Sequence, residues 1–272
     1  MGGISERTVN GVVFRTADSF AEAGGAVHGF STRLGGVSRG IWASMNLGTT
    51  RGDDPECVKE NYRRYFAAIG ASMDKLVMSN QVHGTEIRTA LPDDYKADLY
   101  APEGYEVDGL ITNEPGVALV VFSADCLPIL FYDPVKGVIC AVHAGWRGTV
   151  AGIAPKAVER MVHDYGCCRS DILAAIGPGI SKCHFETHGE VPEAVRAVLS
   201  AGQADSCILD HGNGKFHVDL KGVNAALLEG AGILPQNLTI DPDCTYCLSE
   251  KYWSHRITGG QRGSQAAVIQ LL

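Results

Sequence analysis

The sequence predicts an α/β (α+β) fold in which a mixed β-sheet core is flanked by helices. Residues 117–122 form a continuous apolar run rich in β-branched side chains, which is typical of a strand buried on both faces. Other segments repeat their apolar residues at spacings of three and four, the period of an amphipathic helix. Because the expected strands outnumber the helices and are often joined by short turns, we expect the helices to lie outside the sheets.

The expected elements follow from local signals. Pro192 suits the first turn of a helix, and Asp219 is a suitable N-cap. Pro155 does not suit a helix interior, so the helix that follows residue 148 begins near this proline or kinks there. In chain order we expect a helix at 55–69, strands at 117–122, 128–132 and 138–142, the helix around Pro155, a strand at 171–176, helices at 192–200 and 219–228, and strands at 238–240 and 266–271.

The composition is that of an ordinary globular protein, with 272 residues of which 45% are hydrophobic and 20% charged. The turn-rich stretches do not resemble a linker, so we expect one catalytic domain over residues 1–272. The net charge of −8, without a basic run, argues against a nucleic-acid or membrane-surface binder. We therefore expect a small-molecule substrate and infer no obligate protein partner.

The first residues, 1–8, lack the apolar core of a signal peptide. The nine cysteines are an odd number, which without an export signal indicates reduced thiols. We therefore expect a cytoplasmic protein.

Three metal-ligating residues stand where predicted elements end: His83, Cys126 and His143. Side chains at strand ends beside glycine-rich turns tend to face a cavity. A thiolate and two imidazoles suit Zn²⁺, and three protein ligands leave a fourth position for water or substrate, as in catalytic sites. The alternative is that each is an inert core thiol or a hydrogen-bonded histidine, because ligands this far apart have no local signature.

Residues 143–148, with the sequence His-Ala-Gly-Trp-Arg-Gly, predict a strand, a turn and a helix N-terminus. Such a turn favours anion binding, and Arg147 would add a forked donor for phosphate. The alternative is that the glycines only permit the turn and that Arg147 is solvated. Asp125 is a candidate to orient a ligand, bind substrate or cap the following turn.

Cys244 and Cys247 have a metal-like C-x₂-C spacing, but a second such pair is missing. They would complete a site only if folding brought Cys183, His184 or His255 beside them, so ordinary thiols are the favoured interpretation. The sequence also lacks a Walker A motif, a G-x-G-x-x-G after a strand, and the deaminase signature H-x-E with P-C-x-x-C. His-x-His pairs, expected of a three-copper cluster, are missing as well.

A series of motifs in fixed order makes the chain resemble the YfiH family, once called multicopper polyphenol oxidases and now described as purine nucleoside phosphorylases. The resemblance runs from about Val27 onward. It rests on FSTRLGGVS at 30–38, SMNLG at 44–48, NQVHG at 80–84, DGLIT at 108–112, ADC at 124–126, HAGWRG at 143–148, IGPGI at 176–180 and CT at 244–245.

The resemblance implies mixed sheets with flanking helices, similar to the catalytic domain of the cytotoxic necrotizing factor toxins. It implies that His83, Cys126 and His143 bind zinc and carry catalysis. The implied activities are phosphate-dependent cleavage of adenosine, inosine, guanosine and methylthioadenosine, and deamination of adenosine. On this hypothesis Arg147 and Arg256 hold phosphate and Asn46 contacts the nucleoside. The chain departs from the family pattern after Asn61 and between residues 255 and 262, which puts these substrate contacts in question.

Two rival enzyme classes stay open. In a Cys-His hydrolase or amidase, of the kind suggested for peptidoglycan-precursor editing, Cys126 would be the nucleophile and His143 its base. In a copper-dependent polyphenol oxidase the same Cys and two His would bind copper. A single such site does not suit the four-electron reduction of oxygen, so the oxidase ranks last. A binding protein with a structural zinc is a further alternative.

Overall fold

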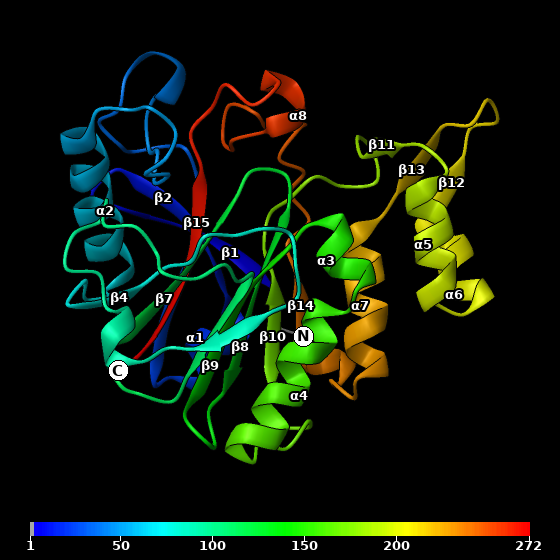
Figure 1. Ribbon diagram of the computed structural model, residues 1–272, viewed down its shortest axis with the longest axis horizontal. Coiled ribbons are helices and arrows are strands. Elements are labelled where there is room, and N and C mark those ends of the chain that lie inside the picture. The colour runs from blue at the N-terminus through cyan, green and yellow to red at the C-terminus, as the bar shows by residue number, and fades with distance from the viewer. Residues whose placement is uncertain (1–2) are drawn as a thin grey trace.

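Two six-stranded sheets form the centre of the molecule in the computed structural model, which describes residues 3–272 (Figure 1). The first sheet has the order β1 (Ile4–Val9), β2 (Val12–Ala17), β3 (Ala26–Ser31), β15 (Gln265–Leu271), β7 (Val117–Ser123) and β4 (Lys75–Val77). The second has the order β14 (Leu238–Ile240), β10 (Leu173–Ile176), β8 (Leu127–Asp133), β9 (Val138–Ala144), β6 (Gly109–Thr112) and β5 (Ile87–Thr89). Both sheets are mixed, because β4–β7, β10–β14 and β5–β6 are parallel pairs among antiparallel ones.

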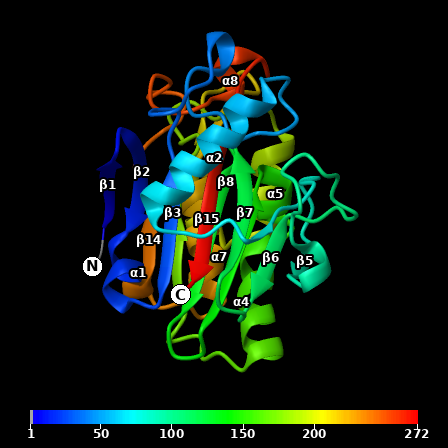
Figure 2. The same cartoon turned by 90° about the vertical axis from the view of Figure 1, so that its left-hand side faces the viewer.

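The two sheets pack face to face, and β7 shows how its sequence allows this. Its alternate residues Val117, Leu119 and Val121 are buried in the core between the sheets. Ala118 and Val120 belong instead to a second core on the outer face of the first sheet. Helix α2 (Pro55–Ile69) covers that outer face, as Figure 2 shows. Because both faces of β7 are covered, residues 117–122 are all apolar.

Three helices cover the outer face of the second sheet: α3 (Trp146–Val150), α4 (Ile153–Tyr165) and α7 (Leu220–Gly230). A small third sheet of β11 (Glu186–Thr187), β13 (Phe216–Val218) and β12 (Ile208–Asp210) lies with α5 (Glu190–Val198) and α6 (Ala201–Cys207) at one end of the molecule (Figure 1). The short helices α1 (Asp18–Ala23) and α8 (His255–Thr258) and the 3₁₀ turns η1 (Gly40–Trp42), η2 (Pro92–Asp94) and η3 (Pro235–Asn237) complete the described elements.

The predicted fold class is confirmed, and so are the elements of the predicted core. Helix α2 has the predicted bounds, and β7, β8 and β9 occupy the three predicted strands. Helix α4 begins at Ile153, so Pro155 lies in its first turn. The Asp219 side chain accepts a hydrogen bond from the Gly222 N–H and caps α7, as predicted. The strands β1 to β6 and those of the small sheet were not predicted.

Among residues 3–272 we find no helix with the length and apolar character needed to cross a membrane.

Candidate metal centre and its cavity

The structure brings His83, Cys126 and His143 together: their ligand atoms all lie within 4.8 Å of one another. His83 lies in the loop between β4 and β5, Cys126 in the short connection from β7 to β8, and His143 in β9. The pairing of β8 with β9 brings the end of one strand beside the other. The Cys126 Sγ lies 3.9 Å from His83 Nε2, and the two imidazoles meet edge to face at 4.9 Å.

Asp108, which directly precedes β6, organises two of these residues. Its side chain is fully buried, and its Oδ1 lies 2.8 Å from His143 Nδ1. The same carboxylate accepts hydrogen bonds from the backbone N–H groups of Val82, His83 and Gly84. A carboxylate on Nδ1 of a histidine leaves Nε2 as the ligand atom and fixes the orientation of the ring. Asp108 therefore holds both the His143 ring and the loop that carries His83.

The backbone around the centre is tightly constrained. His83 and Asp125 have φ angles of 62° and 85°, conformations that cost non-glycine residues about 1–3 kcal/mol. Gly145 has an ordinary φ of −69°, but a Cβ there would lie 2.7 Å from His83 Cδ2 and 3.3 Å from Cys126 Sγ. The glycine of the predicted turn is thus required by the close approach of the two ligands.

The Asp125 carboxylate anchors the segment that carries Cys126. It accepts hydrogen bonds from the Thr245 hydroxyl at 2.6 Å, the Ser254 hydroxyl at 3.1 Å and the Arg256 backbone N–H at 2.7 Å. Asp125 therefore connects the metal centre to the segment before and within α8. The sequence left three roles open for Asp125. These contacts fit the first of them, which is to orient the neighbouring Cys126.

Cys126 and His143 share a charge-stabilised arrangement. Burial opposes ionisation of Cys126, but the positive charge and hydrogen bond of His143, helped by His83, lower the pKa of the thiol to about 6. Burial likewise opposes protonation of His143, but Cys126 and Asp108 outweigh it and raise the imidazole pKa to about 9. The site therefore favours a thiolate, which is the form that binds metals and attacks carbonyls.

A cavity of about 170 Å³ opens beside His83, Cys126 and His143. Arg51 and Arg262 line it together, and both donate to the Ser264 hydroxyl, at 3.2 and 3.1 Å. Burial and the nearby charge of Arg51 lower the pKa of Arg262 to about 10. The buried Arg262 Nε and the hydroxyls of Ser79 and Ser123 belong to residues that line the cavity, and they have no hydrogen-bond partner among residues 3–272. Two adjacent guanidinium groups with unused donors form a suitable anion site.

The residues predicted to contact substrate are not among those that line this cavity. Asn46 is fully buried, and its amide joins the Gly48 and Ser264 N–H groups to Asp53. Arg147 is exposed beside the Trp146 ring, and neither it nor Arg256 is among the residues that line the cavity. The Arg256 guanidinium donates instead to the backbone oxygens of His184 and Glu186. Asn46 thus acts on the cavity indirectly, through the position of Ser264.

Sequence reasoning missed Asp108, Arg51 and the role of Arg262. Asp108 lies immediately before a strand and opens the DGLIT motif at 108–112, and this position was a usable signal. Arg51 and Arg262 lie in loops far apart in the chain, and the local pattern of neither loop indicates that they meet. Their convergence is visible only in the folded chain.

Comparison with known proteins identifies the family. The family model described as "Multi-copper polyphenol oxidoreductase laccase" matches residues 27–272. A Deinococcus radiodurans protein named purine nucleoside phosphorylase is 42% identical over 90% of this chain and 88% of its own. YlmD of Geobacillus stearothermophilus, also named a purine nucleoside phosphorylase, is 35% identical over 90% of each chain.

Solved structures give the same result. The crystal structure of the Geobacillus YlmD has a TM-score of 0.89 and 32% identity, covering 97% of both chains. The crystal structure of the Bacillus licheniformis hypothetical protein YfiH has a TM-score of 0.90 and 29% identity, covering 98% of this chain and 99% of its own. The motifs, the family model and these two folds agree: the chain belongs to the YfiH family.

Proposed function

We propose that this protein is a zinc-dependent purine nucleoside phosphorylase, acting on adenosine, inosine, guanosine and methylthioadenosine, that also deaminates adenosine. Relatives with 42% and 35% identity carry the name purine nucleoside phosphorylase. The observation that carries the proposal is one cavity lined both by the three metal-ligating residues and by a pair of arginines. Such a cavity suits a substrate that brings an anion to a metal centre.

The donor set fits zinc. One thiolate and two imidazoles are common zinc ligands, and a three-ligand set leaves a coordination position for substrate. Asp108 fixes the tautomer of His143 in the way that carboxylates support zinc-bound histidines. Copper is the alternative ion for the same ligands. A bound zinc ion supplies Lewis acidity, the property that hydrolytic removal of a purine amino group requires.

Arg51 and Arg262 are our candidates for the phosphate site. Their like charges lie side by side, and the Arg262 Nε is buried without a partner. A phosphate between them would relieve the repulsion and accept forked hydrogen bonds. We infer that these arginines, and not Arg147 and Arg256, orient phosphate toward the ribose.

The nucleoside would occupy the rest of the cavity. Phe122 is half-buried in its wall and would offer an aromatic face to a purine, and Ser79 and Ser123, whose buried hydroxyls have no partner among residues 3–272, line the same cavity. In phosphorolysis a phosphate oxygen forms a bond to the ribose C1′ while the bond from C1′ to the purine nitrogen breaks. The electron pair and a proton go to the purine. The chain's task is to hold phosphate and nucleoside in line and exclude water from C1′.

The test is chromatography of zinc-quantified protein incubated with adenosine, with and without phosphate. We expect phosphate-dependent release of adenine and phosphate-independent formation of inosine, both lost in Cys126→Ser. Arg262→Gln removes one charged donor, worth about 1.5–3 kcal/mol, so the KM for phosphate should rise roughly 10- to 100-fold. Inosine formation should persist in this variant.

Arg256→Gln is the matched control, because Arg256 is an arginine outside the cavity. An unchanged phosphate KM in Arg262→Gln would reject the assigned phosphate site. If protein with one metal ion in this centre releases no adenine and forms no inosine, the proposed activities are rejected.

A second candidate function is a Cys-His hydrolase or amidase, and the thiolate favoured at Cys126 is the observation that supports it. Cys126 would attack a carbonyl, with His143 as proton donor and acceptor and Asp108 orienting the ring. Chelation distinguishes the two functions. Removal of the metal should abolish activity if the protein is a phosphorylase. If it is a Cys-His hydrolase, removal of the metal should free the Cys126 thiolate for attack.

A further inference from the structure

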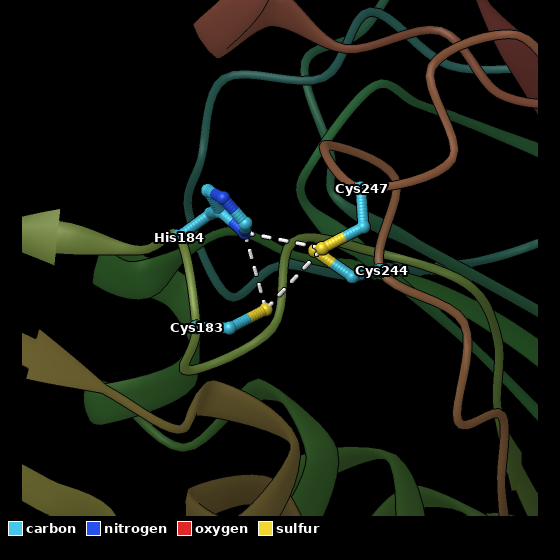
Figure 3. Close-up of side chains that lie close together, drawn as sticks. All are labelled: Cys183, His184, Cys244 and Cys247. Carbon is cyan, nitrogen blue, oxygen red and sulfur yellow. Dashed lines mark hydrogen bonds between the residues drawn. The ribbon is translucent and has the colours of Figure 1, made fainter.

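A second cluster of metal-ligating side chains lies between the main sheets and the small sheet. The Cys3His cluster consists of Cys183, His184, Cys244 and Cys247, whose ligand atoms all lie within 4.8 Å of one another. Two members follow β10, and the other two lie between β14 and α8. Figure 3 shows the three sulfurs and the imidazole converging on one point. The unpaired C-x₂-C of the sequence is therefore completed by the neighbouring loop.

The spacing of these atoms fits a tetrahedral ion. Zinc at 2.3 Å from sulfur and about 2.05 Å from nitrogen requires S···S distances of about 3.8 Å and S···N distances of about 3.6 Å. Cys183 Sγ lies 3.6 Å from Cys247 Sγ, and His184 Nδ1 lies 3.2 Å from each of these sulfurs. We propose that the Cys3His cluster is a structural zinc site, distinct from the centre at Cys126.

Neighbouring groups already orient the ligands. The His184 ring stacks on Tyr246 at 4.1 Å between centroids, with an interplanar angle of 16°, and this contact directs Nδ1 toward the sulfurs. The Ser181 backbone N–H lies 3.4 Å from the buried Cys244 Sγ and donates to it. Backbone donors to a cysteine sulfur favour the thiolate that a metal requires.

The number of ligands assigns the site a structural role. Three thiolates and an imidazole complete the tetrahedral shell of zinc, which leaves no position for substrate. The ion would fasten the loop after β10 to the segment before α8. These two segments also meet through the Gly179–Cys244 bridge and the Thr245 N–H bond to Gly179, and Arg256 in α8 donates to the loop backbone.

The cluster also supports the first metal centre. Thr245, beside Cys244, donates to the Asp125 carboxylate, and Asp125 precedes Cys126. The structural ion would therefore hold the segment that positions Asp125, although none of its ligands lines the catalytic cavity. Loss of the structural ion should therefore lower thermal stability before it affects the cavity.

The test is the zinc content of the full chain, purified with reductant, saturated with zinc and desalted. We expect two zinc ions per chain in the wild type, one in Cys126→Ser, one in Cys183→Ser/Cys247→Ser, and a lower Tm in the double variant. The control Cys168→Ser alters another exposed cysteine, outside both clusters, and should retain two.

Cobalt gives a second readout that does not depend on folding of the double variant. Cys126→Ser loaded with one Co²⁺ should show tetrahedral d–d bands and charge-transfer absorption with the intensity of three thiolates. One zinc per chain in the wild type that is retained in Cys183→Ser/Cys247→Ser would overturn the proposal. So would a cobalt spectrum without thiolate charge transfer, or a Cys183–Cys247 disulfide that persists after reduction and zinc addition. The zinc counts do not depend on any catalytic activity, so the proposed function can fail while this site stands.

Discussion

Asp108→Asn tests how far the metal centre depends on one buried carboxylate. Asp108 accepts four hydrogen bonds, from the backbone of Val82, His83 and Gly84 and from the His143 ring. The substitution keeps the shape but replaces one oxygen by an NH₂ group. If that group replaces Oδ2, it faces the N–H groups of Val82 and Gly84. If it replaces Oδ1, it faces the His83 N–H and His143 Nδ1, which favours the wrong tautomer of His143.

The magnitude follows from these contacts. In either orientation two of the four hydrogen bonds are lost, each worth about 1.5–3 kcal/mol to a charged acceptor. Relaxation of the loop around His83 recovers part of this, so we expect about 3 kcal/mol of lost stability. For a chain of this size that corresponds to a Tm lower by roughly 6–12 °C. Loss of a carboxylate behind a metal-binding histidine weakens zinc binding about 10- to 100-fold.

The assay combines zinc competition against a chromophoric chelator with thermal unfolding of the zinc-free protein. Asp93→Asn, at an exposed position, is the control for the loss of one charge. The reasoning is refuted if Asp108→Asn binds zinc within threefold of the wild type and unfolds at the same temperature. A lower Tm with unchanged zinc affinity would reject only the role of Asp108 in fixing His143.

Two further variants test other parts of the structure. Gly145→Ala should preserve the fold but lower activity about 100-fold, because the added Cβ displaces His83. Steady-state kinetics checks this, with Gly202→Ala as the control because a Cβ at that position meets open space. His28 is buried, and burial lowers its pKa to about 4 from 6.5, so the unfolded chain binds more protons between these values. The stabilising contribution of neutral His28 is present above pH 6.5 and is lost as the pH falls toward 4. At roughly 1.4 kcal/mol per pH unit, the free energy of unfolding should fall by about 3 kcal/mol over this range. His28→Gln should flatten urea-derived stability over this range; parallel curves would contradict it.

The parts of the fold that sequence predicted are those with strong local signals. Strands β7, β8 and β9 are mostly apolar because both faces are covered, and α2 lies between the Asp54 cap and Gly70. The strands β11, β12 and β13 contain only two or three residues, too few for a periodic pattern. Their pairing depends on contacts between distant segments, which a single sequence does not display.

The candidate site divides in the same way. His83, Cys126 and His143 stand at element ends inside recognisable motifs, so the sequence predicts them as one site, and the fold brings them together. Asn46 was predicted to contact substrate because of its motif, which stays a prediction; in the fold its amide bonds to backbone groups and to Asp53. Arg262 lies in the segment that enters β15, and only the tertiary structure shows that this segment reaches the cavity.

The central place of β15 has a consequence for folding. This strand comes last in chain order, yet it pairs on one side with β3, from the beginning of the chain, and on the other with β7. Until it inserts, β3 and β7 each present an open edge, and Arg262 and Ser264, just before β15, cannot reach the cavity. Pairing across such sequence separations slows folding, because a large loop-closure entropy is spent before the contacts form. During synthesis His83, Cys126 and His143 are therefore made long before the sheet can close, and a chain interrupted ahead of β15 would expose two sheet edges that invite aggregation.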